Sequence, residues 1–280
     1  MGQIQHQRRS RLHGWLADER GAITPVVIFL VALIAACLGV GVVGGRYLIN
    51  TYTQIKDVEN AHQIVPELPT KDAQEQQLDD SVQTGTIDFD ALREDNSDIY
   101  AWIYIPDTHV NYPVCQRADS NDYYLTHSAE DEESEVGAIF SEAQFNHADL
   151  GDQVTVLYGH NGYASTMFSD LHEYGRREYL DAHDKIYVYA PDGVRTYQVF
   201  SAFSAGERHI MDAFDFQTEE GLTAFINYLK APEAIDAQVT DAEVKPSDKI
   251  LVLSTCNSGV IESQGRYLVC GVLIDERPAQ

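Results

Sequence analysis

A cysteine stands at the end of an apolar run near the C-terminus, and its position raises the question of its chemistry. In the stretch KILVLSTCNSG, residues 249–259, the apolar residues 250–253 lead to Cys256, and Asn257 and Gly259 indicate a turn. A buried strand that ends in this way presents a thiol at a loop. Such a thiol could pack in a core, form half of a disulfide, bind a metal ion or act as a nucleophile.

The other cysteines narrow these possibilities. Of the 4 cysteines, Cys37 lies in an apolar N-terminal segment, and Cys115 and Cys270 lie inside apolar, strand-like sequence. At most one disulfide can form among the cysteines beyond that segment. We expect Cys115 and Cys270 to be small buried hydrophobic residues, with a disulfide between them as the open alternative. Cys256 is flanked by polar residues and is the candidate for a reactive thiol.

A reactive thiol needs a base or a positive charge nearby, because its ordinary pKa of about 8.5 leaves little thiolate at neutral pH. The stretch VLYGHNGY, residues 156–163, is a second apolar run, and it ends in Gly159 and His160. If the two strands are parallel neighbours, His160 and Cys256 meet at one edge of the sheet. Arg266 begins the next apolar run. After a turn its guanidinium can return to the same edge and stabilise a developing oxyanion.

Each of these residues also has a simpler interpretation. The chain has 10 histidines, so spacing alone does not select His160, and an arginine at a strand start is usually a solvated cap. No close pair of cysteines or histidines has the spacing of zinc ligands, and the acidic run at residues 128–135 lacks the regular spacing of a calcium loop. The sequence therefore predicts no metal site and no cofactor.

Short β-rich segments supply the elements that must position these groups. Turn signals separate eight of them, at residues 99–105, 110–114, 136–140, 153–159, 185–190, 194–203, 249–255 and 267–274. Helical patterns cover residues 87–96, 164–175 and 218–230. This organisation predicts a mainly β domain with inserted helices, in which eight strands form a closed or nearly closed barrel.

The N-terminal part predicts a transmembrane helix at residues 21–46. Residues 21–45 carry no charge, and the apolar run at residues 26–43 is long enough to cross hydrocarbon about 30 Å thick. A bacterial lipobox ending at Cys37 is the alternative, although apolar sequence continues beyond it. Because arginines are concentrated in residues 1–20, we expect a cytoplasmic basic tail and an extracellular C-terminal part.

The part of the chain beyond this anchor is strongly acidic. The formal net charge is −25, and of the 44 Asp and Glu residues only Asp18 and Glu19 precede the anchor. Nucleic acid and anionic lipid headgroups are therefore poor partners for the outer surface. Residues 47–86 are polar and predict an extracellular stalk, whereas residues 87–280 predict the folded domain.

At the residues singled out above, the sequence resembles the sortases, cysteine transpeptidases of Gram-positive cell surfaces. LSTC ending at Cys256, YGHN containing His160, and the offset of Arg266 match motifs of that family. The stretches FDALREDNSDIYAWIYIPDTHVNYPVCQ, SNDYYLTH, GAIF and MFSDLHEY are similar to the class B subgroup. The order and spacing of these motifs extend the resemblance over nearly all of residues 87–280.

The resemblance implies a fold and a set of roles. The fold is an eight-stranded sortase barrel with an N-terminal helical addition and a helix before the cysteine strand. Cys256 would attack the carbonyl of a sorting-signal threonine to form a thioacyl enzyme. His160 would protonate the leaving amine and later deprotonate the incoming amine, and Arg266 would position the signal and support the oxyanion. The resemblance also places four residues along the groove that binds the signal: Asn121, Leu125, Tyr158 and Ser254.

One departure concerns the group that orients the histidine. Some class B members carry an aspartate two residues beyond the cysteine, where this chain has Ser258. No carboxylate is therefore assigned to orient His160.

The function that the resemblance implies is that of a transpeptidase in the plasma membrane of a Gram-positive bacterium. It would join secreted proteins that bear a C-terminal sorting signal to an amine of peptidoglycan or of a pilin. A surface cysteine protease would instead release its acyl product to water, and an added amine distinguishes the two enzymes. A non-catalytic adhesin or scaffold that uses the acidic face is a further alternative, and it predicts insensitivity to thiol-blocking reagents.

Overall fold

The computed structural model describes residues 87–162, 165–256 and 265–279, together with short helical stretches between residues 28 and 52. The chain divides into two compact units, residues 1–53 and 54–280. The predicted basic tail at residues 1–20, much of the predicted transmembrane helix and nearly all of the predicted stalk lie outside the described residues. Within the described part of the chain, none of the helices has the length and apolar character needed to cross a membrane.

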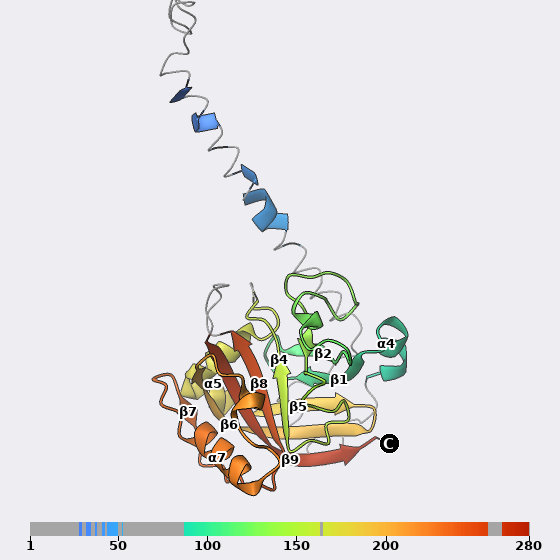
Figure 1. Ribbon diagram of the computed structural model, residues 1–280, viewed down its shortest axis with the longest axis vertical. Helices are drawn as coiled ribbons and strands as arrows, with labels where there is room; N and C mark the ends of the chain where they lie inside the picture. The colour runs from blue at the N-terminus through green and yellow to red at the C-terminus, as the bar shows by residue number, and fades with distance from the viewer. Residues whose placement is uncertain are drawn as a thin grey trace, which may run out of the picture. The chain divides into compact units, whose positions relative to one another are not determined.

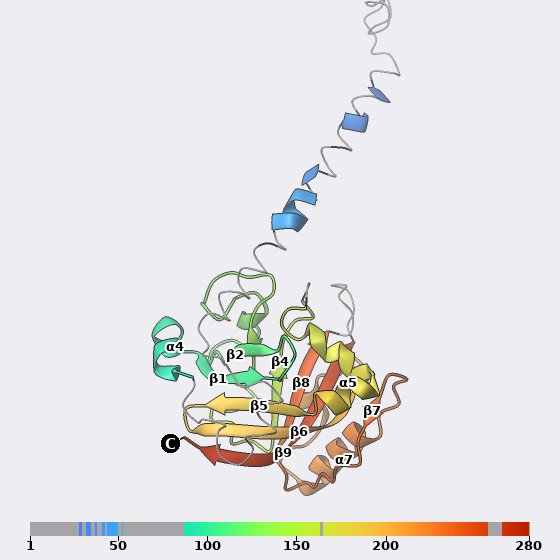
Figure 2. The ribbon, with the colours of Figure 1, turned by 180° about the vertical axis from the view of Figure 1, so that it is seen from behind.

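Eight strands of the second unit close into a barrel (Figures 1 and 2). They pair in the order β5-β1-β2-β3-β4-β8-β9-β6, and a further pairing of β6 with β5 closes the ring. Their bounds are β1 Ile99–Tyr104, β2 Asn111–Cys115, β3 Ile139–Phe140, β4 Val154–Tyr158, β5 Lys185–Ala190, β6 Gly193–Ala205, β8 Ile250–Cys256 and β9 Arg266–Pro278. The predicted eight-stranded barrel is thus confirmed. β7 (Gln238–Val239) adds a two-residue pairing to β6, too short for a sequence pattern to predict.

The apolar run before Cys256 is explained by burial on both faces of β8. Leu251 and Leu253 belong to the main hydrophobic cluster, whereas Ile250 and Val252 belong to a second cluster that includes residues of α7. Because successive side chains of a strand point to opposite faces, a strand that is covered on both sides needs an apolar residue at every position. β8 is therefore held rigidly by the core, and it fixes the position of the residues at its end.

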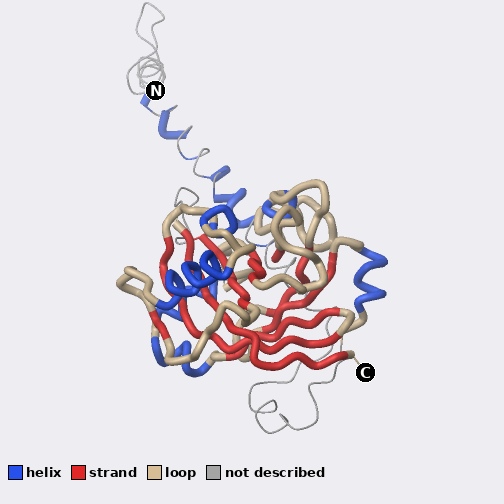
Figure 3. The backbone as a smooth tube through the Cα atoms, turned by 60° about the horizontal axis from the view of Figure 1, so that its bottom comes forward, coloured by secondary structure: helices blue, strands red, loops and turns tan. Residues whose placement is uncertain are grey.

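Short helices surround the barrel (Figure 3). Their bounds are α4 Phe89–Asp95, α5 Arg177–Ala182, α6 Ile210–Ala213 and α7 Glu219–Lys230, with 3₁₀ helices η1 Tyr123–Leu125 and η2 Ser169–Gly175. α7 begins as predicted, because Thr218 Oγ1 accepts a hydrogen bond of 3.2 Å from the Gly221 amide. α4 and α7 lie on opposite sides of the barrel (Figures 1 and 2), and they confirm the helical addition and the helix before the cysteine strand.

The predicted helix at residues 164–175 is wrong in its first part and in its type. Ser165 and Met167 have positive φ angles of 59° and 53°, which an α-helix does not accommodate. The described helical residues begin only at Ser169, and they form the 3₁₀ helix η2 instead of an α-helix. The amphipathic pattern of the segment is real, because Leu171 and Tyr174 are buried. The left-handed residues that precede them could not be inferred from that pattern.

Cys115 and Cys270 are buried, as predicted, and they are unpaired. Each is 0% exposed, Cys115 in β2 and Cys270 in β9. Burial raises the pKa of both thiols well above the ordinary value, so that neither is a thiolate at neutral pH. The two residues act as small hydrophobic side chains of the core.

Candidate active site

Two parallel strands end at the same edge of the barrel, as the sequence predicts. β4 and β8 pair in parallel with Tyr158 opposite Ser254, and the Gly159 amide donates a 3.1 Å hydrogen bond to the Ser254 carbonyl. His160 therefore follows β4 at the edge where Cys256 ends β8. The side chain of Cys256 and residues 257–264 lie outside the described part of the structure.

Arg266 returns to this edge from the next strand. β9 is antiparallel to β8, and Cys256 is the register partner of Arg266. The pairing places the first residue of β9 directly beside the last residue of β8. The structure thus brings the backbone positions of Cys256 and Arg266 together and sets His160 at the end of the neighbouring strand.

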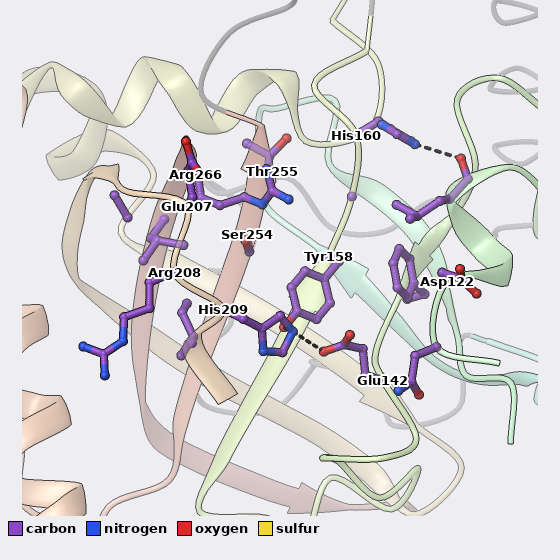
Figure 4. A pocket seen from close by; sticks show the side chains of 17 residues that line it. Asp122, Glu142, Tyr158, His160, Glu207, Arg208, His209, Ser254, Thr255 and Arg266 are labelled. Carbon is purple, nitrogen blue, oxygen red and sulfur yellow. Dashed lines mark hydrogen bonds and ion pairs between the residues drawn. The ribbon is translucent and has the colours of Figure 1, made fainter. Parts of the chain in front are cut away.

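A groove with a cavity volume of about 180 Å³ runs beside these strand ends (Figure 4). His160 and Arg266 line it. The four residues predicted to contact a peptide also line it: Asn121, Leu125, Tyr158 and Ser254. All six described residues of the predicted site therefore face one cavity, although their contribution to binding or catalysis stays a prediction.

His160 is oriented by a backbone carbonyl. Its Nε2 atom lies 2.8 Å from the Leu125 carbonyl oxygen (Figure 4). Because a carbonyl can only accept, Nε2 carries the hydrogen, and Nδ1 is the ring atom that gains and loses a proton while this bond persists. The preceding Gly159 sits so close to Ile139 and Phe168 that an added Cβ would approach them to 2.5 and 2.7 Å. This tight packing fixes the turn that presents the histidine.

Tyr158 remains a protonated hydroxyl on the floor of the groove. Burial raises the pKa of its phenol well above the ordinary value, and the charge of Glu142 raises the pKa further. The positive charge of Arg266 acts in the opposite direction on the same pKa.

Several residues of the groove were not identified from the sequence: Asp122, Phe140, Glu142, Glu207, Arg208, His209 and Thr255. Two of them, Glu142 and His209, interact directly, with their Oε2 and Nε2 atoms 2.9 Å apart. Glu142 follows β3, and His209 immediately precedes α6. The two residues are distant in sequence, and no motif joined them, although the acid two residues beyond the GAIF stretch was a signal that could have been used.

Comparison with known proteins identifies proteins that are similar to this chain. The model of the sortase domain family matches residues 103–274. Sortase B of Listeria monocytogenes is 32% identical over 206 residues, which are 73% of this chain and 80% of that protein. The structure of a Staphylococcus aureus sortase B–substrate complex has a TM-score of 0.60 at 30% identity, covering 67% of this chain and 84% of that one. A sortase B complexed with triglycine has a TM-score of 0.60 at 29% identity, covering 67% and 85%.

Proposed function

Since the chain belongs to the sortase B family of cysteine transpeptidases, we propose that it cleaves a C-terminal sorting signal and transfers the acyl group to an amine. The proposed substrates are secreted proteins that bear such a signal, and the proposed acceptor is an amine of peptidoglycan or of a pilin. The observation that carries the proposal is the meeting of the β4, β8 and β9 ends, where His160 and Arg266 line one groove and Cys256 is the register partner of Arg266.

Cys256 is the proposed nucleophile. Its thiolate attacks the carbonyl carbon of the signal's threonine, and the resulting tetrahedral oxyanion collapses with cleavage of the carbon–nitrogen bond. The product is a thioester between the enzyme and the N-terminal part of the substrate. A second amine then attacks this thioester, a new amide bond forms, and the thiolate leaves. The strand that carries Cys256 is buried on both faces, which supports a precisely held nucleophile.

His160 is the proposed acid and base of the two half-reactions. It gives a proton to the amine that leaves in the first step and takes one from the amine that enters in the second. The bond from Nε2 to the Leu125 carbonyl supports this role, because it holds the ring and assigns both transfers to Nδ1. We propose that this backbone carbonyl performs the orienting task for which no carboxylate was assigned.

Arg266 is proposed to stabilise the oxyanion, and the groove is proposed to hold the signal. Its position opposite Cys256 in the ladder between β8 and β9 supports the first role. Asn121, Leu125, Tyr158 and Ser254 are proposed to contact the signal's side chains, since they line the cavity that leads to the strand ends.

The ratio of two products tests the proposed reaction. We expect the chain, incubated with peptides that carry sorting-signal pentapeptides, to yield a new amide with triglycine when triglycine is present. The relative whose structure contains triglycine motivates the choice of this amine. Mass spectrometry of the products with and without triglycine provides the measurement. Release of only the free acid under both conditions would identify a cysteine protease and reject the transpeptidase.

We propose further that residues 21–46 anchor the enzyme in the plasma membrane of a Gram-positive bacterium. In this arrangement residues 1–20 are cytoplasmic, residues 47–86 form a stalk, and residues 87–280 form the extracellular catalytic domain. The support is the uncharged apolar run and the arginines before it. We expect protease added to intact cells to digest the catalytic domain while an N-terminal epitope stays protected. Recovery of the chain in the soluble fraction would contradict the anchor.

A further inference from the structure

The end of the groove remote from His160 contains a group of interacting side chains, two of which, Glu142 and His209, have no role in the proposed reaction (Figure 4). We call Glu142, Tyr158 and His209 the clasp. His209 Nε2 lies 2.9 Å from Glu142 Oε2 and 3.3 Å from the Tyr158 hydroxyl. Because the carboxylate accepts, the imidazole donates from Nε2. The ring also packs at 5.2 Å from the ring of Phe145 and at 6.1 Å from that of Tyr158.

The clasp connects segments that are far apart in the chain. Glu142 follows β3, Tyr158 ends β4, and His209 precedes α6 in the connection between β6 and α7. All three side chains line the groove, and the side chain of Glu142 is 16% exposed. The side chain of His209 is 35% exposed, so the hydrogen bond is partly shielded from water and contributes more than one on an open surface. The clasp therefore joins the segment that leads into α6, which lines one side of the groove, to the residues at the ends of β3 and β4 on the other side.

The other ring nitrogen of His209 has a weaker neighbour. Nδ1 lies 3.3 Å from Asp212 Oδ2, but no hydrogen bond satisfies this buried atom. The side chain of Asp212 is 69% exposed, and a pair so open to water contributes little. Of the two ring nitrogens, only Nε2 therefore forms a hydrogen bond with residues that line the groove.

We propose that His209 and Glu142 are positioning residues for the sorting signal. By holding the segment that leads into α6 against the ends of β3 and β4, they fix the width of the groove at the end away from the reacting thioester. This inference rests on the proposed function, because it assigns the groove to the signal peptide. Because this side of the groove is already held in place before the peptide binds, binding does not carry the entropic cost of ordering it. The clasp contributes equally to substrate and transition-state binding, so it acts on KM and leaves kcat unchanged.

Substitutions at His209 distinguish the two ring nitrogens. The amide nitrogen of His209→Gln can occupy the place of Nε2, whereas that of His209→Asn lies near the place of Nδ1. We expect His209→Asn to raise KM by about 10-fold with kcat within about 2-fold, and His209→Gln to restore KM to near the original value. Asp212→Asn is the matched control and should leave KM unchanged. A fall in kcat at constant KM, or equal KM values for the Asn and Gln variants, would overturn the inference.

A double-mutant cycle tests whether the partner is Glu142. Glu142→Met removes the acceptor at similar volume, and combined with His209→Asn it should raise KM no further than either change alone. Additive effects would contradict a shared hydrogen bond. The thermal unfolding temperature of each variant shows whether a rise in KM comes from a change in the groove or from destabilisation of the whole domain.

Binding to the full chain with Cys256→Ala separates this inference from the proposed function. Calorimetry with the sorting peptide should show Kd rising by the same factor as KM in the clasp variants. Equal Kd values with and without the clasp would reject the inference. Peptide binding without any turnover by the unmodified enzyme would instead reject the proposed reaction, while the Kd values would still decide the role of the clasp.

Discussion

Replacement of Cys256 by alanine is expected to abolish cleavage and amine transfer, lowering kcat/KM for a sorting peptide by at least about 10⁴-fold. No other described cysteine of the folded domain can substitute, because Cys115 and Cys270 are 0% exposed and burial holds the pKa of each thiol high. Initial rates with and without triglycine provide the measurement. The acyl-enzyme adduct should also disappear from the peptide fragment that contains Cys256.

The matched control is Cys270→Ala, which removes a thiol from the same domain. Cys270 packs in the cluster beneath α7, so we expect a loss of about 1 kcal/mol in the free energy of unfolding and little change in kcat. Activity that survives Cys256→Ala, or that is lost equally in Cys270→Ala, would contradict the assignment of the nucleophile.

The meeting of the strand ends could be predicted from the sequence because it depends on strand direction and length alone. Two largely apolar runs, which lead to Tyr158 and to Cys256, are typical of strands buried on both faces, and such strands are commonly parallel neighbours. Their register in the structure, Tyr158 opposite Ser254, brings His160 and Cys256 to the same edge. Arg266 begins the next strand, so one turn of the chain after Cys256 is enough to return it to that edge.

The clasp could not be predicted, because it depends on three segments whose proximity is set by packing. α6 spans only Ile210–Ala213, which is too short for a periodic pattern. Glu142 lies in a loop after a two-residue strand. His209 and Glu142 are far apart in the sequence, and they come into contact only when the barrel closes. The same limit applies to the left-handed residues Ser165 and Met167, which replaced the expected start of a helix.

Replacement of Arg266 by glutamine is expected to lower kcat by about 10²- to 10³-fold, with a smaller rise in KM. Arg266 begins β9 opposite Cys256 and lines the groove. A cation placed there stabilises an oxyanion more than the neutral carbonyl from which it forms, so the loss falls on kcat. Arg266→Lys keeps a point charge without the planar fork, and we expect an intermediate kcat. Steady-state kinetics with one sorting peptide provide both constants.

Arg208 supplies a matched control, because it is a second arginine that lines the same groove. Its Nη2 atom donates to the Ala213 carbonyl at 2.9 Å, and its guanidinium lies 5.6 Å from the centre of the Phe214 ring, so its charge is engaged within its own segment. Arg208→Gln should therefore leave kcat within about 2-fold of the original value. If Arg208→Gln lowered kcat as much as Arg266→Gln, the general positive charge of the groove would be responsible. If Arg266→Gln changed only KM, Arg266 would hold the peptide without stabilising the oxyanion. A selective loss of kcat at Arg266 would instead show that the reaction needs a cation at the position opposite Cys256, where the proposed oxyanion forms.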